Sequence, residues 1–338
     1  MKGKIIAIVF VLLLIVSFGA AANNCSCNLE DHYKSDYSQK NQKYCLGLII
    51  DPEGDPYLKK RVTLSGDPPS SWDWRNVDGK DYTTPIRDQG VCGSCYAFAP
   101  IGALEALYNI KNNDPDIDID LSEQFLVSCS YGYPYMNRGC CGGTAGFTMA
   151  FLLLTGVPLE SCFPYQAVDS KGRDAYDCPY GLPSNEPVKC SDRCSEWRNQ
   201  VIKIGEDGFE GFLDAYSIKI AISTYAPVVT GFEVYEDFKD YTGGVYKHQT
   251  GEFLGYHGVS IVGYNDDPGY WICKNSWGTE WGENGWFKIA YGECQIEKMC
   301  HYFTSYTKSK ALSYPFTNII FGKIPILIYF LRNILIFL

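Results

Sequence analysis

Fifteen cysteines dominate what this 338-residue chain can become, because every pair that oxidises ties two segments together. Such a number is typical of proteins that fold in an oxidising, exported setting. The count is odd, so at least one thiol stays free if all the others pair. A zinc site is a weaker explanation, since the chain has only four histidines and no two Cys-x-x-Cys pairs at finger spacing.

The first 22 residues are predicted to be a secretory signal peptide. Lys2 and Lys4 precede an apolar run over 5–18, and small residues ending at Ala22 follow it. This basic, apolar, small-residue order is that of a secretory signal, with an uncleaved membrane anchor as the alternative. We therefore expect a secreted or otherwise extracytoplasmic protein, for which a lumenal, lysosome-like compartment also fits.

Composition and boundary signals divide the rest of the chain. A net charge of -10 argues against nucleic acid as a partner, because phosphate binding needs concentrated positive charge. Residues 23–67 are polar, contain the turn-rich stretch 51–56 and end at Pro68-Pro69. They are predicted to form a short pro-region, or else an arm that stays attached. Residues 68–308 are expected to form one globular body.

This body has helical patterns first and strand patterns later. Ile101, Leu104 and Leu107 recur at helical spacing within a helix predicted over 95–111, and a second helix is expected to begin near Ser122. The predicted strands are 226–234, 257–264, 269–274 and 285–290. The order predicts an α+β fold of two lobes, with an active site in the cleft between them.

Two further stretches carry weaker signals. Aspartates alternate over 114–120 without the glycine and late glutamate of an EF-hand, so a solvated loop is favoured over a calcium site, and no metal or cofactor is expected. The tail 309–338 is apolar from Leu312 but interrupted by charges and a proline. A membrane tether, a lipid-anchor signal and a non-native extension of the reading frame are the alternatives for this tail.

Cys95 is the candidate nucleophile. A cysteine attacks a carbonyl as the thiolate, which a helix N-terminus and a neighbouring imidazolium favour. Cys95 follows a glycine-containing turn over 89–94 and opens the predicted helix, where a backbone N–H could also hold an oxyanion.

His257 is the candidate base among four histidines. His32 lies in the predicted pro-region, His301 near the end of the body, and His248 in a polar loop. His257 begins a predicted apolar strand, where a base would be firmly positioned. From the residues alone, a structural histidine held by hydrogen bonds is as good an explanation.

Several motifs in order resemble those of the papain family of cysteine proteases. Residues 92–98, CGSCYAF, resemble its nucleophile motif, and residues 274–278, KNSWG, its asparagine motif, with YHGV at 256–259 where the family has its histidine. His257 follows Cys95 by 162 positions, which indicates insertions. Supporting matches are SWDWR at 71–75, LSEQ at 121–124, GCCGG at 139–143 and WGENG at 281–285.

The resemblance implies a papain-like fold, with a helical lobe and a barrel-like β lobe, and a role for each matching residue. Cys95 would be the nucleophile, His257 the base, and Asn275 the acceptor that orients the imidazole. Gln89 would donate to the oxyanion, beside the Cys95 N–H. Protein or peptide substrates would be cleaved through a thioester acyl-enzyme. The residues expected to screen the histidine or contact substrate are Trp277, Gly142, Gly143, Gly231, Gly258 and Met299.

The resemblance also suggests roles for the other cysteines. Cys92–Cys140 and Cys129–Cys178 match family disulfides. Cys162 would pair with Cys190 or Cys194, and Cys294 with a substitute such as Cys300. Cys273 is expected to be a buried free thiol. A Cys45–Cys95 bond is one way in which the pro-region could mask the nucleophile.

Departures from the family pattern bear on specificity. Pro100 is expected to bend the nucleophile helix. Tyr256 and Gly258 are expected to reshape the specificity pocket, whose floor at Met299 favours apolar side chains. Residues 95–96, 161–165 and 232–235 are most similar to cathepsin C, an aminodipeptidase whose added N-terminal domain blocks its cleft. Because residues 23–67 are short for such a domain, we predict an endopeptidase; aminodipeptidase and peptide-binding pseudoprotease are the alternatives.

Overall fold

The structure is a computed structural model that describes residues 44–50, 63–117, 119–131, 137–174, 178, 183–205, 210–212 and 214–308. The chain divides into two compact units, Met1–Ser38 and Gln39–Leu338, and every described residue belongs to the second. The predicted signal peptide, the turn-rich stretch 51–56, His32 and the tail from residue 309 lie outside the described residues. Within those described, no helix is both long and apolar enough to cross a membrane.

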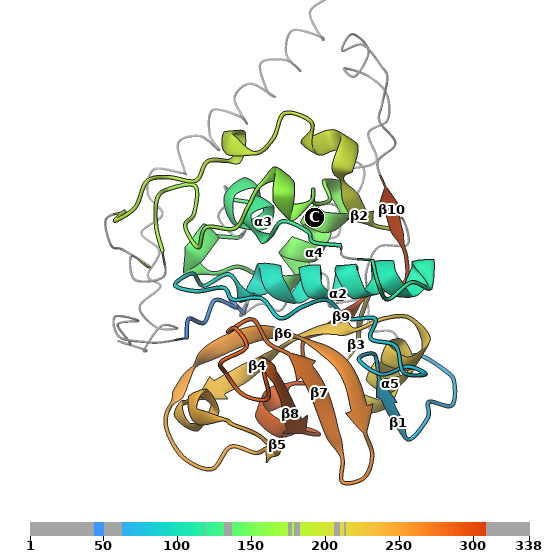
Figure 1. The fold of residues 1–338 in the computed structure, drawn as a ribbon. Coiled ribbons are helices and arrows are strands. Elements are labelled where there is room, and N and C mark those ends of the chain that lie inside the picture. Colours follow the sequence, from blue (N-terminus) through green and yellow to red (C-terminus); the bar gives the residue numbers. More distant parts are fainter. Residues whose placement is uncertain are drawn as a thin grey trace, which may run out of the picture. The chain divides into compact units, whose positions relative to one another are not determined.

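Helices of the first half and strands of the second form the two parts of this unit (Figure 1). The helices are α2 (Cys95–Asn112), α3 (Glu123–Cys129), α4 (Ala145–Leu154) and α5 (Ala215–Thr224). The strands are β1 (Ser71–Asp73), β2 (Ile202–Ile204), β3 (Glu210–Phe212), β4 (Val228–Tyr235), β5 (Val245–Tyr246), β6 (Phe253–Asn265), β7 (Tyr270–Lys274), β8 (Trp286–Ala290), β9 (Cys300–Tyr302) and β10 (Tyr306–Lys308).

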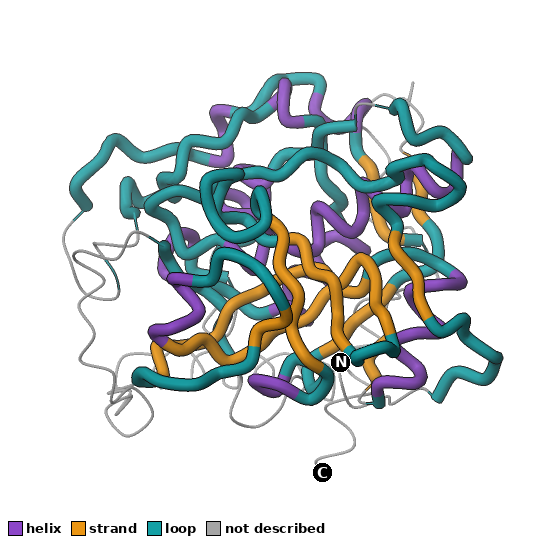
Figure 2. The backbone as a smooth tube through the Cα atoms, turned by 60° about the horizontal axis from the view of Figure 1, so that its bottom comes forward, coloured by secondary structure: helices purple, strands orange, loops and turns teal. Residues whose placement is uncertain are grey.

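The main sheet has the strand order β3-β9-β4-β6-β7-β8-β5, and β1 also pairs with β6. Its central strands β4, β6, β7 and β8 pair antiparallel, and in Figure 2 they run side by side. A second sheet joins β10 to β2. This arrangement confirms the predicted α+β fold.

Local sequence explains where the helices begin and end. The side chain of Ser122 caps α3 by accepting a hydrogen bond from the Phe125 N–H at 3.0 Å, and Asp214 caps α5 in the same way. Helix α2 is capped after Asn112 by Asn113, whose left-handed backbone (φ 51°) directs its N–H back to the carbonyls of Asn109 and Ile110. Pro100 lies inside α2 without ending it.

Two apolar cores flank helix α2. One packs the main sheet around Phe232, Trp271 and Phe287, and the other packs α2 against α3 and α4. Residues 95–109 of α2 are all buried. A helix buried on every side lies between two packed layers, so α2 holds its first residue, Cys95, at the junction of the two parts.

The disulfides correct one predicted pairing. Cys92–Cys140 is present, but the predicted Cys129–Cys178 bond is wrong, because Cys129 pairs with Cys190. Cys178 instead joins Cys141. Cys140 and Cys141 are consecutive in the short 3-10 turn Gly139–Cys141, so neighbouring positions serve two different bonds.

The remaining cysteines follow the prediction in part. Of the two candidate partners of Cys162, the structure selects Cys194. The suggested Cys294–Cys300 bond is wrong, since both are buried free thiols, as is Cys273. Cys45 and Cys95 are also free and buried, so the suggested Cys45–Cys95 bond is absent.

Candidate active site

Cys95 is the first residue of α2 and is fully buried. The turn before it depends on glycine. Gly90 has a φ of 55°, and a Cβ on Gly93 would lie 2.7 Å from the carbonyl oxygen of Cys140. The sulfur therefore lies at the positive end of the helix dipole, as the sequence predicted.

His257 and Asn275 meet across neighbouring strands of the sheet. His257 lies within β6, and Asn275 directly follows β7, which pairs with β6. The imidazole Nε2 donates a hydrogen bond to the Oδ1 of Asn275 at 2.7 Å. This contact fixes the tautomer with the proton on Nε2, so the buried Nδ1, which has no hydrogen-bond partner among the described residues, is left to act as a base.

Close approach at Gly258 brings the histidine strand to Cys95. A Cβ on Gly258 would lie only 3.2 Å from the carbonyl oxygen of Cys95. The same Cβ would lie 3.7 Å from the backbone nitrogen of Tyr96, so β6 packs against the first turn of α2. A side chain at 258 would therefore require β6 or the start of α2 to shift by a few tenths of an ångström.

Trp277 covers the histidine. Its ring centroid lies 4.6 Å from that of His257, and Trp277 is buried. An indole at this distance shields the hydrogen bond between His257 and Asn275 from water, which strengthens it.

Gln89 has the orientation that an oxyanion donor needs. Its side chain is fully buried, and its Oε1 accepts a hydrogen bond from Ser276 Oγ at 2.7 Å. Its Nε2 therefore points the other way and donates to the carbonyl oxygens of Cys92 and Cys45. Ser276 was not singled out from the sequence, although its place directly after Asn275 was a usable signal.

Residues 44–50, which we call the covering segment, lie over this site. The Gly47 carbonyl accepts from Gly143 N–H at 2.9 Å, and Ile49 N–H donates to the Gly143 carbonyl at 2.8 Å. Leu48 N–H donates to the Tyr256 carbonyl on β6 at 3.2 Å. The segment is thus hydrogen-bonded to both parts of the molecule.

The side chains of the covering segment enter both cores. Leu46 packs into the sheet core and Leu48 into the helical core. A Cβ on Gly231 would collide with Leu48 Cδ2 and lie 3.3 Å from Met299 Cε. Gly231 and Met299, two predicted specificity residues, thus lie beside one leucine side chain.

Burial controls the protonation of the covered pair. Burial raises the pKa of the Cys95 thiol to about 11, although backbone N–H groups of Gly258 and Gly47 oppose the rise. Burial lowers the pKa of His257 to about 4, against the effect of its hydrogen bond to Asn275. Both groups are therefore neutral at physiological pH while the covering segment is in place.

The structure brings most of the predicted site residues together. Contacts connect His257 to Asn275 and Trp277, the adjacent Gly258 to Cys95, and Gln89 to Cys92 and Ser276. Gly142, Gly143 and Gly231 contact the covering segment, and Met299 lies beside Gly231. His248 instead contacts Asp237 at 3.1 Å in a loop, and His301 lies in β9. Within the part of the chain that the structure describes, no cluster of side chains could hold a metal ion.

Comparisons with known proteins agree with this geometry. Residues 68–304 match the family model described as papain family cysteine protease. A cathepsin B-like protein of Giardia intestinalis, CP3, is 36% identical over 236 residues, which cover 68% of this chain and 72% of that one. Cathepsin C of Schistosoma mansoni is 35% identical but only 52% of its length is covered.

A solved structure gives the same result. The procathepsin B S9 of Trypanosoma congolense superposes with a TM-score of 0.61 at 26% identity, over 77% of this chain and 86% of that one. Such relatives and the disulfides indicate a lysosomal or secreted compartment and protein or peptide substrates. The chain belongs to the papain family of cysteine proteases and is a cysteine peptidase.

Proposed function

We propose that this protein is a cysteine endopeptidase in which Cys95 is the nucleophile, His257 the base and Asn275 the residue that orients the imidazole. The observation that carries the proposal is the fixed tautomer of His257, held by Asn275 at 2.7 Å, on a strand whose next residue, Gly258, packs against the backbone of Cys95. Because Asn275 orients the imidazole, the proposed mechanism needs neither a carboxylate nor a second histidine beside His257.

The reaction uses groups already in place. His257 Nδ1 takes the thiol proton, and the thiolate attacks the carbonyl carbon of the scissile peptide. Gln89 Nε2 and the Cys95 backbone N–H stabilise the oxyanion. The imidazolium then protonates the leaving amine, and water, with His257 again as base, hydrolyses the thioester.

The covering segment supports both the oxyanion donor and an inhibited precursor. The Cys45 carbonyl accepts a hydrogen bond from Gln89 Nε2 at 3.1 Å, as an oxyanion would. Leu48 lies where Gly231 and Met299 meet, so the adjoining substrate pocket accepts an apolar side chain. Residues 44–50 thus belong to a pro-region, predicted over 23–67, that must leave before substrate binds.

The course of the covering segment favours an endopeptidase. The chain continues beyond both residue 44 and residue 50, so the cleft holds an internal stretch of polypeptide. An aminodipeptidase is the second candidate, favoured by the 35% identity to cathepsin C of Schistosoma mansoni. Peptides with free and with blocked N-termini separate the two, and activity on free termini alone would contradict the endopeptidase.

Labelling with a thiol-directed peptide inactivator tests the catalytic roles. We expect the activated wild type to be labelled at Cys95, Cys95→Ala not at all, and His257→Ala at least about 100-fold more slowly, since general base catalysis contributes about 10²–10⁴-fold. An activated wild type that is not labelled near neutral or mildly acidic pH contradicts the proposal.

The two ends of the chain complete the proposal. Residues 1–22 would be removed as a signal peptide, and the apolar tail 309–338 would tether the protein to a membrane or be removed. A mass spectrum of the mature protein measures both ends, and retention of residues 1–22 would contradict their removal as a signal peptide.

A further inference from the structure

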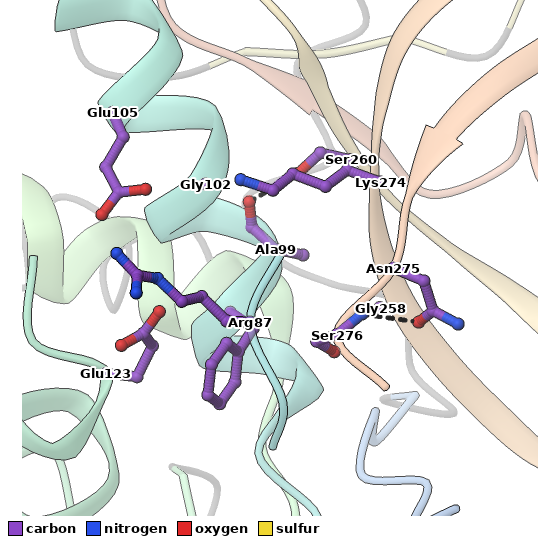
Figure 3. A pocket seen from close by; sticks show the side chains of 11 residues that line it. Arg87, Ala99, Gly102, Glu105, Glu123, Gly258, Ser260, Lys274, Asn275 and Ser276 are labelled. Atoms are coloured by element: carbon purple, nitrogen blue, oxygen red, sulfur yellow. Dashed lines mark hydrogen bonds between the residues drawn. The ribbon is translucent and has the colours of Figure 1, made fainter. Parts of the chain in front are cut away.

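A buried polar network lies directly behind the catalytic residues, and the mechanism above does not use it. It joins Lys274 of β7, Glu105 of α2 and Thr84, which lies in the loop between β1 and α2. All three are at least nine-tenths buried. The network borders a cavity of about 20 Å³ that Gly258, Asn275 and Ser276 also line (Figure 3).

The hydrogen bonds of the network run from the lysine, through the threonine hydroxyl, to the carboxylate. Lys274 Nζ donates to Thr84 Oγ1 at 2.7 Å, and this hydroxyl donates to Glu105 Oε2 at 2.6 Å. The other carboxylate oxygen of Glu105 accepts from the backbone N–H of Leu121 at 2.8 Å. The Thr84 hydroxyl has one proton, which it donates to Glu105, so the lone pairs of its oxygen need a donor such as Lys274.

The network spans the junction of the two parts. Lys274 and Asn275 are consecutive, and Figure 3 shows their side chains pointing to opposite sides, Lys274 toward α2 near Gly102 and Asn275 away from it. Glu105 follows Cys95 by ten residues, about 15 Å along the helix. The network thus links the residue before Asn275 to the helix that carries the nucleophile.

Strand β6 contacts α2 near the start of the helix. Gly258 approaches the carbonyl of Cys95, and Ser260 Oγ donates to the carbonyl of Ala99 at 2.6 Å. Both come from β6, whereas Asn275 follows β7. Lys274 is the side chain that connects the end of β7 to α2, where a Cβ on Gly102 would be 3.6 Å from Nζ.

We propose that Lys274 is a positioning residue, which through Thr84 and Glu105 fixes Asn275, and hence the imidazole of His257, relative to Cys95. This inference rests on the proposed roles of those three residues. Small displacements of a base or nucleophile reduce the rate of attack strongly, so such a link affects turnover and not only folding.

Lys274 and Glu105 could instead serve only to compensate each other's buried charge. A double variant separates this explanation from the positioning role. Lys274→Met leaves the Glu105 carboxylate uncompensated, so both stability and kcat fall. Lys274→Met/Glu105→Gln removes both charges. We expect it to regain most of the wild-type melting temperature while its kcat remains about 10-fold or more below wild type, with KM within about twofold.

Each variant is made as the full chain, activated beside the wild type and compared per mole of processed chain by mass spectrometry. Thr84→Val keeps both charges but removes the hydroxyl that links them, so it should also lower kcat. This variant provides the test if Lys274→Met does not fold. The control is Lys288→Met on the neighbouring strand β8. Lys288 is a partly exposed lysine paired with Glu283, and its replacement should change neither the melting temperature nor kcat.

The rate at which iodoacetamide alkylates Cys95 provides a second measurement that a purely structural role would leave unchanged in the double variant. We expect it to fall together with kcat. Wild-type kcat and alkylation rate in the double variant would overturn the positioning role. Failure of iodoacetamide to modify Cys95 in the activated wild type would instead contradict the proposed function.

Discussion

Glu160 is a carboxyl whose surroundings oppose its charge. Its Oε1 accepts a hydrogen bond from the Tyr165 N–H, but its Oε2 is buried with no hydrogen-bond partner among the described residues. Burial raises its pKa from 4.5 to about 7, and the nearby carboxylate of Asp120 adds to the rise. The folded protein therefore holds this proton at a pH where the unfolded chain has lost it.

This difference predicts how stability depends on pH. Between pH 4.5 and about 7 the folded state binds more protons at Glu160 than the unfolded state does, so its contribution to stability falls as the pH rises. We expect Glu160→Gln to lose less melting temperature than wild type between these two pH values. The exposed Glu186→Gln should behave as wild type, and an equal fall in all three proteins would contradict the assignment.

Individual residues also show what the sequence could predict about the site. The motif positions of Cys95, His257 and Asn275 sufficed to bring them together, because each motif also sets its local backbone. Disulfide partners were predicted from the sequence less accurately. The prediction pairs Cys129 with Cys178 and considers Cys190 only for Cys162, but the packing of the loops around α3 joins Cys129 to Cys190.

The covering segment is the element whose fit depends most on one glycine. A Cβ on Gly47 would lie 1.8 Å from the carbonyl oxygen of Gly93, a backbone atom that cannot rotate away. We expect Gly47→Ala to expel the segment from the cleft. Because burial is the main cause of the raised pKa of Cys95, uncovering the thiol should lower that pKa.

The measurement is the rate at which a thiol-directed inactivator labels the unprocessed precursor. We expect Gly47→Ala to react about 10-fold faster or more, since a one-unit fall in pKa gives about ten times more thiolate. Gly66→Ala is the matched control, because a Cβ there meets only ordinary contacts from 3.7 Å. A folded Gly47→Ala precursor that reacts as slowly as wild type would show that the segment does not shield Cys95.

Elements with a strong local pattern were predicted closely, and elements made by pairing were not. Helix α2 extends over 95–112 against the predicted 95–111, and Pro100 does not shorten it. Strand β6 begins at Phe253, so the prediction that His257 starts the strand is wrong. Residues 253–256 include Gly255, which weakens their strand pattern, and pairing of Phe253 with Tyr235 of β4 extends the strand.

At the scale of the whole molecule, cross-links and free thiols are unevenly distributed. Among the described residues, the four disulfides all lie within 92–194, in the part that contains α3 and α4. The main sheet instead buries the free thiols of Cys273 and Cys300 completely. Both parts have an apolar core, but covalent cross-links add to the packing only in the part with α3 and α4.

Reduction should consequently loosen one part before the other. Removing a native disulfide typically costs about 2–5 kcal/mol, whereas the sheet core loses no cross-link. We expect a reductant to speed hydrogen exchange in α3, α4 and residues 183–201 first, while β4, β6, β7 and β8 stay protected. Under the same conditions an alkylating reagent should modify the released thiols but leave Cys273 and Cys300 unmodified until the sheet unfolds. Simultaneous loss of protection in both parts would mean that α2, shared by the two cores, makes them one cooperative unit.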